Sequence, residues 1–302
     1  MPNPSRTATR RAVHESKQRQ LGGPLSILAA ALLWGTTGTV ASQAPSGVPA
    51  AATGSAGLAL GGLLLFLTSR GVPARARREW WLLALGAVAV AGYPVTFYPA
   101  VARTGVAVAT VVALGSAPVF AGLAAWLTGG TRPSTRWTVA TAAAVTGCAV
   151  LVLGSKSGSV DPLGIALAAC GGFAYVVYSL VGGRLIAHGR PSGSVMGAMF
   201  GGAALLVLPV VLVHEPSWLV TSRGAAVALH LAVCTTFLAY RLFGYGLRHT
   251  AVQVATTLTL AEPAVAALLG VAVLDERLSV ESWCGLAVLA SGLVVLTLPV
   301  RR

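Results

Sequence analysis

The chain contains two copies of one long apolar pattern. Residues 98–118 read YPAVARTGVAVATVVALGSAP, and residues 243–263, 145 positions later, read FGYGLRHTAVQVATTLTLAEP. A duplication on this scale constrains the chain to fold as two related halves. Pro118 and Pro263 occupy the same place in the two copies. Because proline lacks a backbone N–H, we predict that these residues kink two matching helices.

The composition places these halves in a membrane. Apolar residues make up 55% of the chain and charged residues 10%, whereas a soluble domain has about 25% charged residues. Apolar runs of about 18 residues or more, the length that crosses a bilayer as a helix, recur throughout. The sequence therefore predicts an all-α polytopic membrane protein with ten transmembrane helices. We place them at 24–43, 49–69, 80–99, 105–127, 137–154, 162–182, 193–213, 224–246, 250–273 and 279–299.

Each half contains five predicted spans. Because five is odd, the second half enters the membrane from the opposite side, so the halves are inverted repeats, as in many secondary transporters. We predict a first five-helix repeat at 24–155 and a second at 161–300. Residues 1–23 are polar and basic, and we predict a disordered cytoplasmic tail there.

Small residues at four-residue spacing occur in the second and seventh spans. Gly57 and Gly61 in the second span correspond to Gly197 and Gly201 in the seventh. Such pairs let helix backbones approach closely in membranes. We therefore predict tight packing of these two spans.

The net charge of +13 is distributed unevenly along the chain. With a cytoplasmic N-terminus, 16 of the 21 basic residues fall on the inner side; Arg103, Lys156, Arg223 and Arg277 fall outside, and Arg241 lies within a span. This is the positive-inside distribution, so we predict that both termini are cytoplasmic and that nucleic acid is not a partner. The scarcity of lysine among abundant alanine, glycine and valine is typical of a GC-rich bacterial genome. That composition favours the bacterial plasma membrane.

The cysteines are single residues in four different spans. They form no pattern typical of zinc or redox chemistry, and we interpret them as small packing residues. The sequence predicts no metal, no cofactor and no catalytic group. The four positions are Cys148, Cys170, Cys234 and Cys284.

Two short motifs stand out in the spans. The first span carries an aromatic-glycine pair, Trp34-Gly35. The second half carries a longer motif, which comprises Ala239-Tyr240, Gly246-Leu247-Arg248, Glu262-Pro263, Ala266, Leu268, Gly270, Leu274, Glu276 and Leu278-Ser279. With these motifs, residues 24–299 resemble the EamA family of the drug/metabolite transporter superfamily. The resemblance implies export of small metabolites and drugs through a cavity lined by the first, third, fourth, sixth, eighth and ninth spans.

Two positions depart from the family pattern. Thr131 stands where an acidic residue is common, and Arg241 stands where the eighth span is usually apolar. The first departure is not expected to disturb the fold. The second bears on the type of substrate.

Two charged residues within spans are the first candidates for function. Glu262 lies near the middle of the ninth span, where a carboxylate is costly to bury. It would bind a substrate amine, pair with Arg241 or carry a proton, or it would satisfy the backbone group freed by Pro263. Arg241 would bind a carboxylate or phosphate by paired hydrogen bonds, or extend its stem toward the membrane surface.

Aromatic and hydroxyl side chains gather on the same spans. Amphipathic rings suit a cavity that binds partly apolar solutes, although rings near span ends also fit an interfacial belt. Threonine hydroxyls in the spans would line the path or bond back to their own helices. A lone histidine, His230, would relay protons or serve a structural role. With Arg241 and Glu262, the candidate substrate-binding residues are Trp34, Thr37, Tyr93, Tyr175, Tyr178 and Tyr240.

These features favour a secondary transporter that exports small amino-acid-like or amphipathic solutes by alternating access. Its partners would be a small-molecule substrate, the lipid bilayer, and a proton or an exchanged solute for coupling. A membrane-embedded enzyme would need clustered carboxylates or histidines at an interface, and the inner loops supply only Glu15 and Glu79. A non-transporting receptor or scaffold with the same fold, or an importer, are the alternatives.

Overall fold

The structure is a computed structural model that describes residues 4–69, 79–129, 132–153, 161–214, 216–275 and 277–298, and these residues form helices joined by short connections. The positions Thr131 and Glu276, and the predicted repeat ends at 154–155 and 299–300, lie outside the described residues. In chain order the elements are α1 (Pro4–Ala41), α2 (Ala50–Leu67), α3 (Trp80–Gly129), α4 (Thr135–Leu153), α5 (Pro162–Ala187), α6 (Ser192–Val213), η2 (Pro216–Val220), α7 (Ser222–His230), η3 (Leu231–Leu238), α8 (Ala239–Gly246), α9 (Val252–Leu258), α10 (Ala261–Leu274) and α11 (Val280–Thr297).

The elements make 10 helices that are long and apolar enough to cross a membrane, which confirms the predicted number. The third and fourth spans belong to one long element, α3, and are joined at Gly105, where φ is 80° and ψ is 160°. Glycine suits this junction because a positive φ places a Cβ atom in a strained position. The eighth span is built from α7, η3 and α8, and the ninth from α9 and α10.

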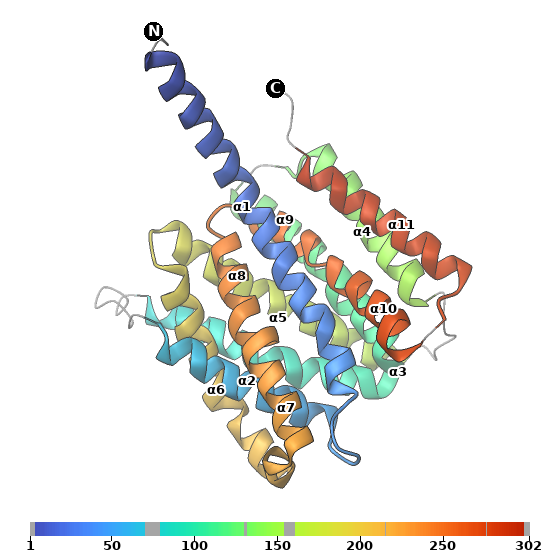
Figure 1. The fold of residues 1–302 in the computed structure, drawn as a ribbon. Helices are drawn as coiled ribbons and strands as arrows, with labels where there is room; N and C mark the ends of the chain where they lie inside the picture. Colours follow the sequence, from blue (N-terminus) through green and yellow to red (C-terminus); the bar gives the residue numbers. More distant parts are fainter. Residues whose placement is uncertain are drawn as a thin grey trace.

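The helices pack in pairs related by the repeat. The second span, α2, lies on the seventh, α6, and the fifth, α4, lies on the tenth, α11 (Figure 1). The third and fourth spans of α3 pack on the sixth span, α5. The eighth and ninth spans pack in the same way on the first span, α1. The third and fourth spans of each half therefore pack on the first span of the other half, as expected for two inverted repeats.

Glycines bring α2 close to its neighbours. A methyl group added at Gly197 would lie 2.7 Å from the carbonyl oxygen of Leu65, which confirms close packing of the second and seventh spans. Gly57 and Gly61 face the eighth span instead. A methyl group at Gly61 would lie 2.4 Å from Cβ of Thr236. The helix α2 is therefore wedged between α6 and η3.

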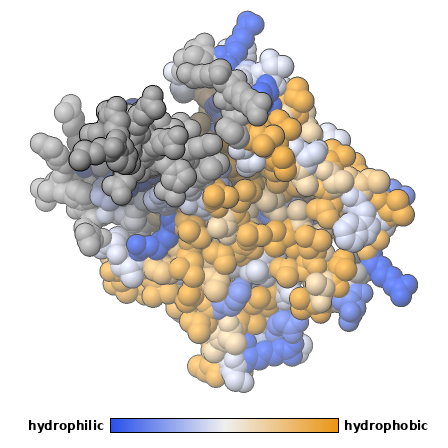
Figure 2. All heavy atoms as spheres, turned by 45° about the horizontal axis from the view of Figure 1, so that its top comes forward, coloured by the Kyte–Doolittle hydropathy of each residue, from blue (hydrophilic) through white to orange (hydrophobic). Residues whose placement is uncertain are grey.

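The outer surface is apolar over a broad band, and Figure 2 shows this face of the molecule largely in the hydrophobic colour. Large side chains such as Leu127 and Leu205, each 73% exposed, belong to the surface that a bilayer would cover. Two cysteines also face outward: Cys148 is buried, but Cys170 and Cys284 are exposed. The prediction that all four cysteines are packing residues is therefore wrong for these two.

The N-terminal segment differs from the predicted disordered tail because α1 begins at Pro4 and continues through residue 23. Residues 1–3 lie outside the described residues. Proline is well placed at the first turn of a helix, where its missing N–H costs nothing. The following residues include Ala, Arg, Glu, Lys and Gln, which have high helix propensity. They extend a helix that the membrane span has already nucleated.

Candidate functional site

The ninth span is interrupted in its middle, between α9 and α10, at Thr259 and Leu260. Pro263 removes the N–H that an unbroken α-helix would direct at the carbonyl of Thr259. The N–H of Glu262 donates to that carbonyl instead, at 3.0 Å, in a tighter turn. The predicted irregularity at Pro263 is thus confirmed as a break just before it. At Pro118, the matching proline, the described backbone remains helical.

Threonine hydroxyls line this break and bond to backbone carbonyls. Thr256 Oγ1 donates to Gln253 O at 3.1 Å, and Thr259 Oγ1 donates to Thr256 O at 2.9 Å. Thr257 Oγ1 also donates to Gln253 O, at 3.0 Å. Side chains that bond to nearby carbonyls compete with the helical ladder. The sequence around the break therefore weakens the α-helix on both sides of Leu260.

Glu262 occupies the first turn of α10, directly after the break. The positive end of a helix favours a negative charge there. Gly35 of α1 lets this turn approach closely, because a methyl group at Gly35 would lie 3.1 Å from the Glu262 carbonyl oxygen and 2.6 Å from Val265. Glu262 is half-buried. Among the described residues, no side chain forms a hydrogen bond or ion pair with its carboxylate.

Contacts from other spans place the break before Glu262 inside the bundle. Tyr175 Oη of the sixth span lies 3.0 Å from Thr259 Oγ1, three residues before Glu262, and Gly35 of the first span lies against the Glu262 carbonyl. Spans from both halves therefore meet at this break.

The eighth span is irregular beside this site. Its middle segment, η3, is a π-helix, in which the N–H of Ala239 donates to Cys234 O, five residues earlier. Such segments are rare and frequently occur at functional sites. The indole Nε1 of Trp34 donates to the carbonyl of Thr235 in this segment at 2.8 Å. Trp34 thus ties the first span to the irregular part of the eighth.

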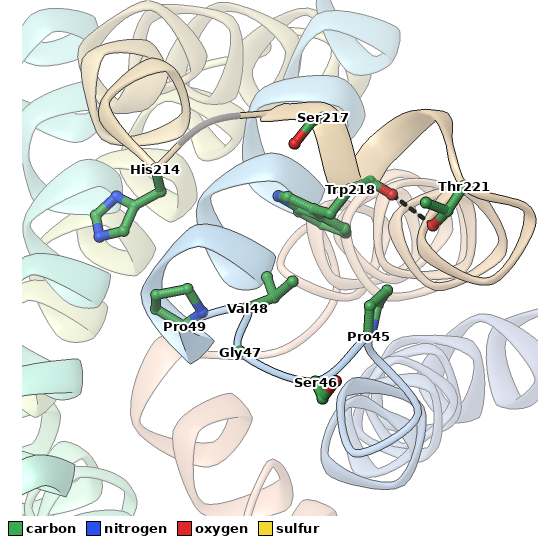
Figure 3. Close-up of a pocket in the computed structure, with 9 residues that line it drawn as sticks. All are labelled: Pro45, Ser46, Gly47, Val48, Pro49, His214, Ser217, Trp218 and Thr221. Carbon is green, nitrogen blue, oxygen red and sulfur yellow. Dashed lines mark hydrogen bonds between the residues drawn. The ribbon is translucent and has the colours of Figure 1, made fainter.

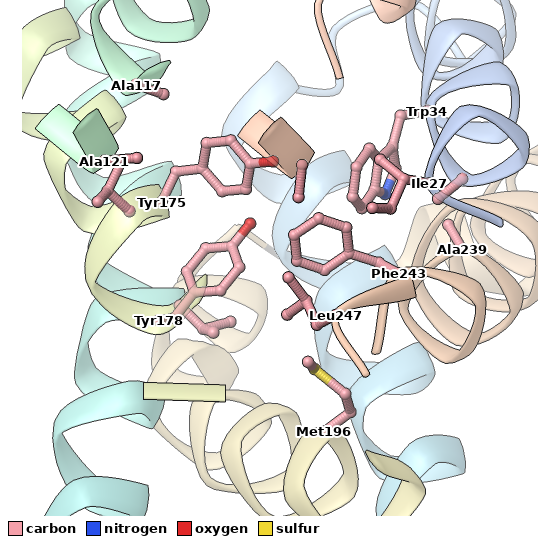
Figure 4. Close-up of a cluster of buried hydrophobic side chains, with 14 of the residues drawn as sticks. Ile27, Trp34, Ala117, Ala121, Tyr175, Tyr178, Met196, Ala239, Phe243 and Leu247 are labelled. Atoms are coloured by element: carbon pink, nitrogen blue, oxygen red, sulfur yellow. The ribbon is translucent and has the colours of Figure 1, made fainter. Parts of the chain in front are cut away.

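Six rings form one connected group, here called the aromatic cluster. The indole of Trp34 lies 4.9 Å from the ring of Tyr240 and 5.5 Å from that of Phe243, measured between centroids. In Figure 4, Tyr175 and Tyr178 reach toward Phe243 from the opposite side to Trp34. The closest ring pair joins the seventh and eighth spans, with centroids 3.9 Å apart. The cluster comprises Trp34, Tyr175, Tyr178, Phe200, Tyr240 and Phe243.

Hydroxyl pairs link the cluster to both irregular spans. The hydroxyls of Tyr178 and Tyr240 lie 3.1 Å apart, which connects the sixth span to the eighth. Tyr175 Oη lies 3.0 Å from Thr259 Oγ1 at the break of the ninth span. These contacts give the buried tyrosine hydroxyls partners, as buried polar groups require.

The structure brings together most, but not all, of the predicted binding residues. Trp34, Tyr175, Tyr178 and Tyr240 belong to the cluster, and Tyr93 and Glu262 adjoin it. Arg241 does not belong: it is exposed, 3.5 Å from Thr68 Oγ1, with its guanidinium over the ring of Phe237. Among the described residues, Arg241 forms no ion pair with Glu262, its exposed position agrees with the alternative that its stem extends toward the membrane surface, and its role in binding stays a prediction.

Thr37 is half-buried without a bonded partner among the described residues, and its neighbour Thr36 makes the relevant contact. Thr36 Oγ1 lies 2.9 Å from His230 Nε2 at the start of the π-helix. The alternative that His230 has a structural role agrees with this contact, which joins the first and eighth spans.

Sequence reasoning missed Phe200, which is 1% exposed and contacts both Tyr178 and Tyr240. Its span carries the glycine pattern at Gly197 and Gly201, for which close helix packing was the predicted role. Phe200 is the single aromatic residue between positions 193 and 213, and this could have identified it as a candidate.

The arrangement sets clear limits on its chemistry. It offers one carboxylate, faces of six rings and tyrosine hydroxyls, but no bonded arginine or lysine among the described residues. A carboxylate and aromatic faces both attract an ammonium group. In the residues that the structure describes, no three His, Cys, Asp or Glu side chains come together as a metal site.

Known proteins share this architecture and much of the sequence. A model of the EamA-like transporter family matches residues 21–153 and 162–298. An uncharacterized transporter of Bacillus subtilis, YwfM, is 36% identical over 281 residues, which cover 92% of this chain and 94% of the relative. The threonine/homoserine exporter RhtA of Salmonella typhimurium is 31% identical over 157 residues, 51% of each chain. One solved crystal structure has a TM-score of 0.76 against this chain, at 25% sequence identity. The match covers 93% of this chain and 99% of the solved chain.

Proposed function

Because the chain belongs to the EamA-like transporter family, we propose that it is a secondary transporter that exports a small ammonium-bearing solute by alternating access. The observation that carries this proposal is the Glu262 carboxylate, which follows directly on the break that Tyr175 contacts at Thr259 and has no basic partner among the described residues. The solute would place its ammonium against Glu262 and its apolar part against the rings.

Export and solute size are inferred from a partial relative. RhtA is a threonine/homoserine exporter and matches about half of this chain. Threonine and homoserine both carry an ammonium group and a short side chain. We propose amino-acid-like solutes of this size, transported outward across the plasma membrane, with both termini in the cytoplasm as the charge distribution favours.

A proton is the proposed coupling ion. A single carboxyl group that holds either a proton or an ammonium group binds the two alternately. Inward movement of the proton would then drive outward movement of the solute. Among the described residues, no basic side chain forms an ion pair with Glu262. Its carboxylate is therefore available to bind a positively charged ligand.

The test is transport in proteoliposomes with Glu262→Gln. Charged hydrogen bonds contribute about 1.5–3 kcal/mol, so we expect the variant to lose about tenfold to a hundredfold in apparent affinity for threonine, homoserine or a short primary amine. Glu281→Gln is the matched control, because Glu281 is an exposed carboxylate in the first turn of α11.

The outcomes separate the alternatives. Unchanged transport by Glu262→Gln would refute the role of the carboxylate. Equal transport of neutral analogues would refute the proposal that the solute is recognised by its ammonium group. Ligand binding without any flux would favour a receptor, and solute accumulation in cells that express the protein would favour an importer.

A further inference from the structure

The short helix α9, which precedes the break in the ninth span, is enclosed on all sides. Residues 255–258 are each 0% exposed, and α9 packs on α1, α3, α4, α5 and α11. Beyond the break, residues 264–267 of α10 are half-buried, and α10 packs chiefly on α1. The bundle therefore closes around the ninth span at the end nearer the two termini, where α9 lies (Figure 1).

Three side chains of the fifth and sixth spans hold α9 in this position. Trp137 Nε1 donates to Gln253 O at 3.0 Å, and Thr141 Oγ1 lies 3.0 Å from Thr257 Oγ1. The hydroxyl of Tyr175 makes the third bond, at the break directly after α9. The closed end is therefore fastened by hydrogen bonds as well as by packing.

The hydroxyl protons fix the direction of two of these bonds. Thr257 and Thr259 each donate to a backbone carbonyl of their own span, and a hydroxyl has a single proton to donate. Thr141 and Tyr175 are therefore the donors in their contacts with these threonines. The ninth span supplies acceptors alone in all three bonds, so each bond can be removed by changing its donor.

Both ends of α9 are non-helical. Ala251, directly before it, is extended, with φ −61° and ψ 144°. Thr259 and Leu260 interrupt the span directly after it. Changes of backbone angle at a few residues at the ends of an element are enough to move that element. The helix α9 can therefore move as a unit while α10 stays packed on α1.

The opposite end of the candidate site is open. Gly38 follows Trp34 by four residues and shares its face of α1. It is exposed, and a methyl group added at Gly38, or at Gly92 beside Tyr93, would meet no atom within 4 Å. A pocket of about 440 Å³ also lies at this end, between residues 45–49 and η2 (Figure 3), but its lining includes none of the candidate site residues. The candidate site is therefore reached along the face of Gly38, from the end away from the termini.

We propose that α9 is the gate that closes the candidate site at the end nearer the termini, and that Trp137, Thr141 and Tyr175 hold it shut. This inference rests on the proposed transport function, because a site that works by alternating access needs a closure that opens on each side. With both termini in the cytoplasm, as proposed above, α9 would be the cytoplasmic gate and the structure would be the outward-open state.

The experiment measures how fast a maleimide reaches a single cysteine in the full chain in nanodiscs, with the four native cysteines replaced by alanine. Leu258→Cys reports on α9 and leaves its hydrogen bonds intact. Leu289→Cys is the matched control, because Leu289 is also 0% exposed but lies in the α4–α11 pair, which the gate leaves in place. Gly38→Cys reports on the open end and should react fastest of the three.

Two conservative variants remove donors and keep most of the side-chain shape. Trp137→Phe and Thr141→Val should each raise the labelling rate of Leu258→Cys about threefold, and together about tenfold, because each frees α9 from one hydrogen bond between helices. Neither variant should change the labelling rate of Leu289→Cys.

The labelling rate does not depend on any solute, so its outcome is separate from the test of Glu262. Unchanged transport by Glu262→Gln would refute ammonium binding and leave the gate in place. A labelling rate of Leu258→Cys that neither donor variant changes would overturn the gate. Equal acceleration of Leu289→Cys would also overturn it, because the variants would then loosen the whole bundle. Faster labelling of Leu258→Cys than of Gly38→Cys would overturn it as well, because the α9 end would then be the open one.

Discussion

The two middle spans of each half start from related sequences and reach different structures. In the first half, the third and fourth spans are helical through Pro94, Pro99 and Pro118, with the one non-helical residue at the Gly105 junction. In the second half, the eighth span contains the π-helix η3, and the ninth is broken at Thr259 and Leu260. The packing of the helices is shared by the two halves, but among the described residues a break or π-helix within a span occurs in the second half alone, and the non-helical residue of the first half lies between two spans.

A few substitutions explain the difference at the prolines. Thr256 and Thr259 of the ninth span correspond to Val111 and Leu114 of the fourth, and Glu262 corresponds to Ala117. Ser116 before Pro118 also donates to a backbone carbonyl, that of Ala113, and the helix continues there. The ninth span carries a run of bonded threonines before its proline, and each such hydroxyl competes with the helical ladder. The number of competing hydroxyls therefore distinguishes the broken span from the continuous one.

The comparison shows how a duplicated scaffold acquires a single asymmetric site. The first half contributes straight helices and one half-buried tyrosine, Tyr93. The second half contributes the carboxylate and the irregular backbone, and Trp34 crosses over from the first span to bond with η3. Broken helices near the middle of the membrane are typical of transporter binding sites.

The largest expected effect comes from making the ninth span resemble the fourth. Thr256→Val with Thr259→Val would remove the competing hydroxyls and the Tyr175 bond, so the helix should extend toward Pro263. We expect transport of threonine or a short amine to fall about tenfold or more, because misplaced site groups are costly. Proteoliposome flux would measure it, and amide hydrogen exchange at 258–262 would report the straighter helix.

The reciprocal change in the first half is the control. Val111→Thr with Leu114→Thr would place hydroxyls before Pro118 without moving any residue of the aromatic cluster, and transport should change little. If the ninth span became straight and transport persisted, the break would have no role in function.

The next effect concerns the bond that joins the halves at η3. Trp34→Phe retains a ring against Tyr240 and Phe243 but leaves the Thr235 carbonyl without the indole donor. We expect a loss of about 1–2 kcal/mol in the free energy of unfolding, measured by denaturation in detergent. Trp137→Phe removes the part-buried bond to Gln253, which also joins the halves, near the start of the regular helix α9, and should cost less. Equal losses would show that the irregular segment η3 depends on its indole bond no more than α9 does.

The fold was predictable from the sequence because membranes impose simple rules. A helix must be long and apolar enough to cross the bilayer, and apolar runs of that length are visible in any one sequence. The ten spans and their arrangement as two repeats follow from these runs and from the 145-residue offset. The continuation of α1 to Pro4 did not follow, because polar residues with high helix propensity also suit a disordered tail.

The candidate site was predictable only in part, because burial depends on which face of each helix turns inward. Glu262, Trp34 and the tyrosines could be proposed from the sequence because charge and aromatic rings are rare in these spans, and their role in binding stays a prediction. The exposed position of Arg241 did not follow from the sequence: it comes directly after Tyr240, and the π-helix before both changes the angle between successive residues. Regular α-helical spacing therefore does not predict which face of the eighth span these residues occupy.

A smaller effect separates a tyrosine hydroxyl that has a hydrogen-bond partner from one that has none among the described residues. Tyr178→Phe would break the contact between the Tyr178 and Tyr240 hydroxyls, and hydrogen bonds between helices in membranes contribute about 0.6 kcal/mol on average. Among the described residues, the hydroxyl of Tyr93 makes no hydrogen bond, so Tyr93→Phe should have almost no effect on the free energy of unfolding. A larger loss for Tyr93→Phe would show that the first half contributes more to the site than its regular helices indicate.

The smallest expected effect lies where the first half meets the second, at the exposed pair of Arg103 and Asp161, 3.2 Å apart. The pKa of Asp161 is lowered, chiefly by the backbone N–H of Gly164 and further by the Arg103 guanidinium and the N–H of Leu163. Because the pKa is lower in the folded chain, the stabilisation is present above the ordinary aspartate pKa and disappears as pH falls through the folded value. Asp161→Asn should therefore lower the melting temperature slightly at neutral pH and have no effect at strongly acidic pH. In the second half, Arg248 has no acidic partner among the described residues. Arg248→Gln should therefore leave the fall in melting temperature at acidic pH unchanged. A change in that pH dependence would mean that Arg248 interacts with an acidic group as Arg103 does.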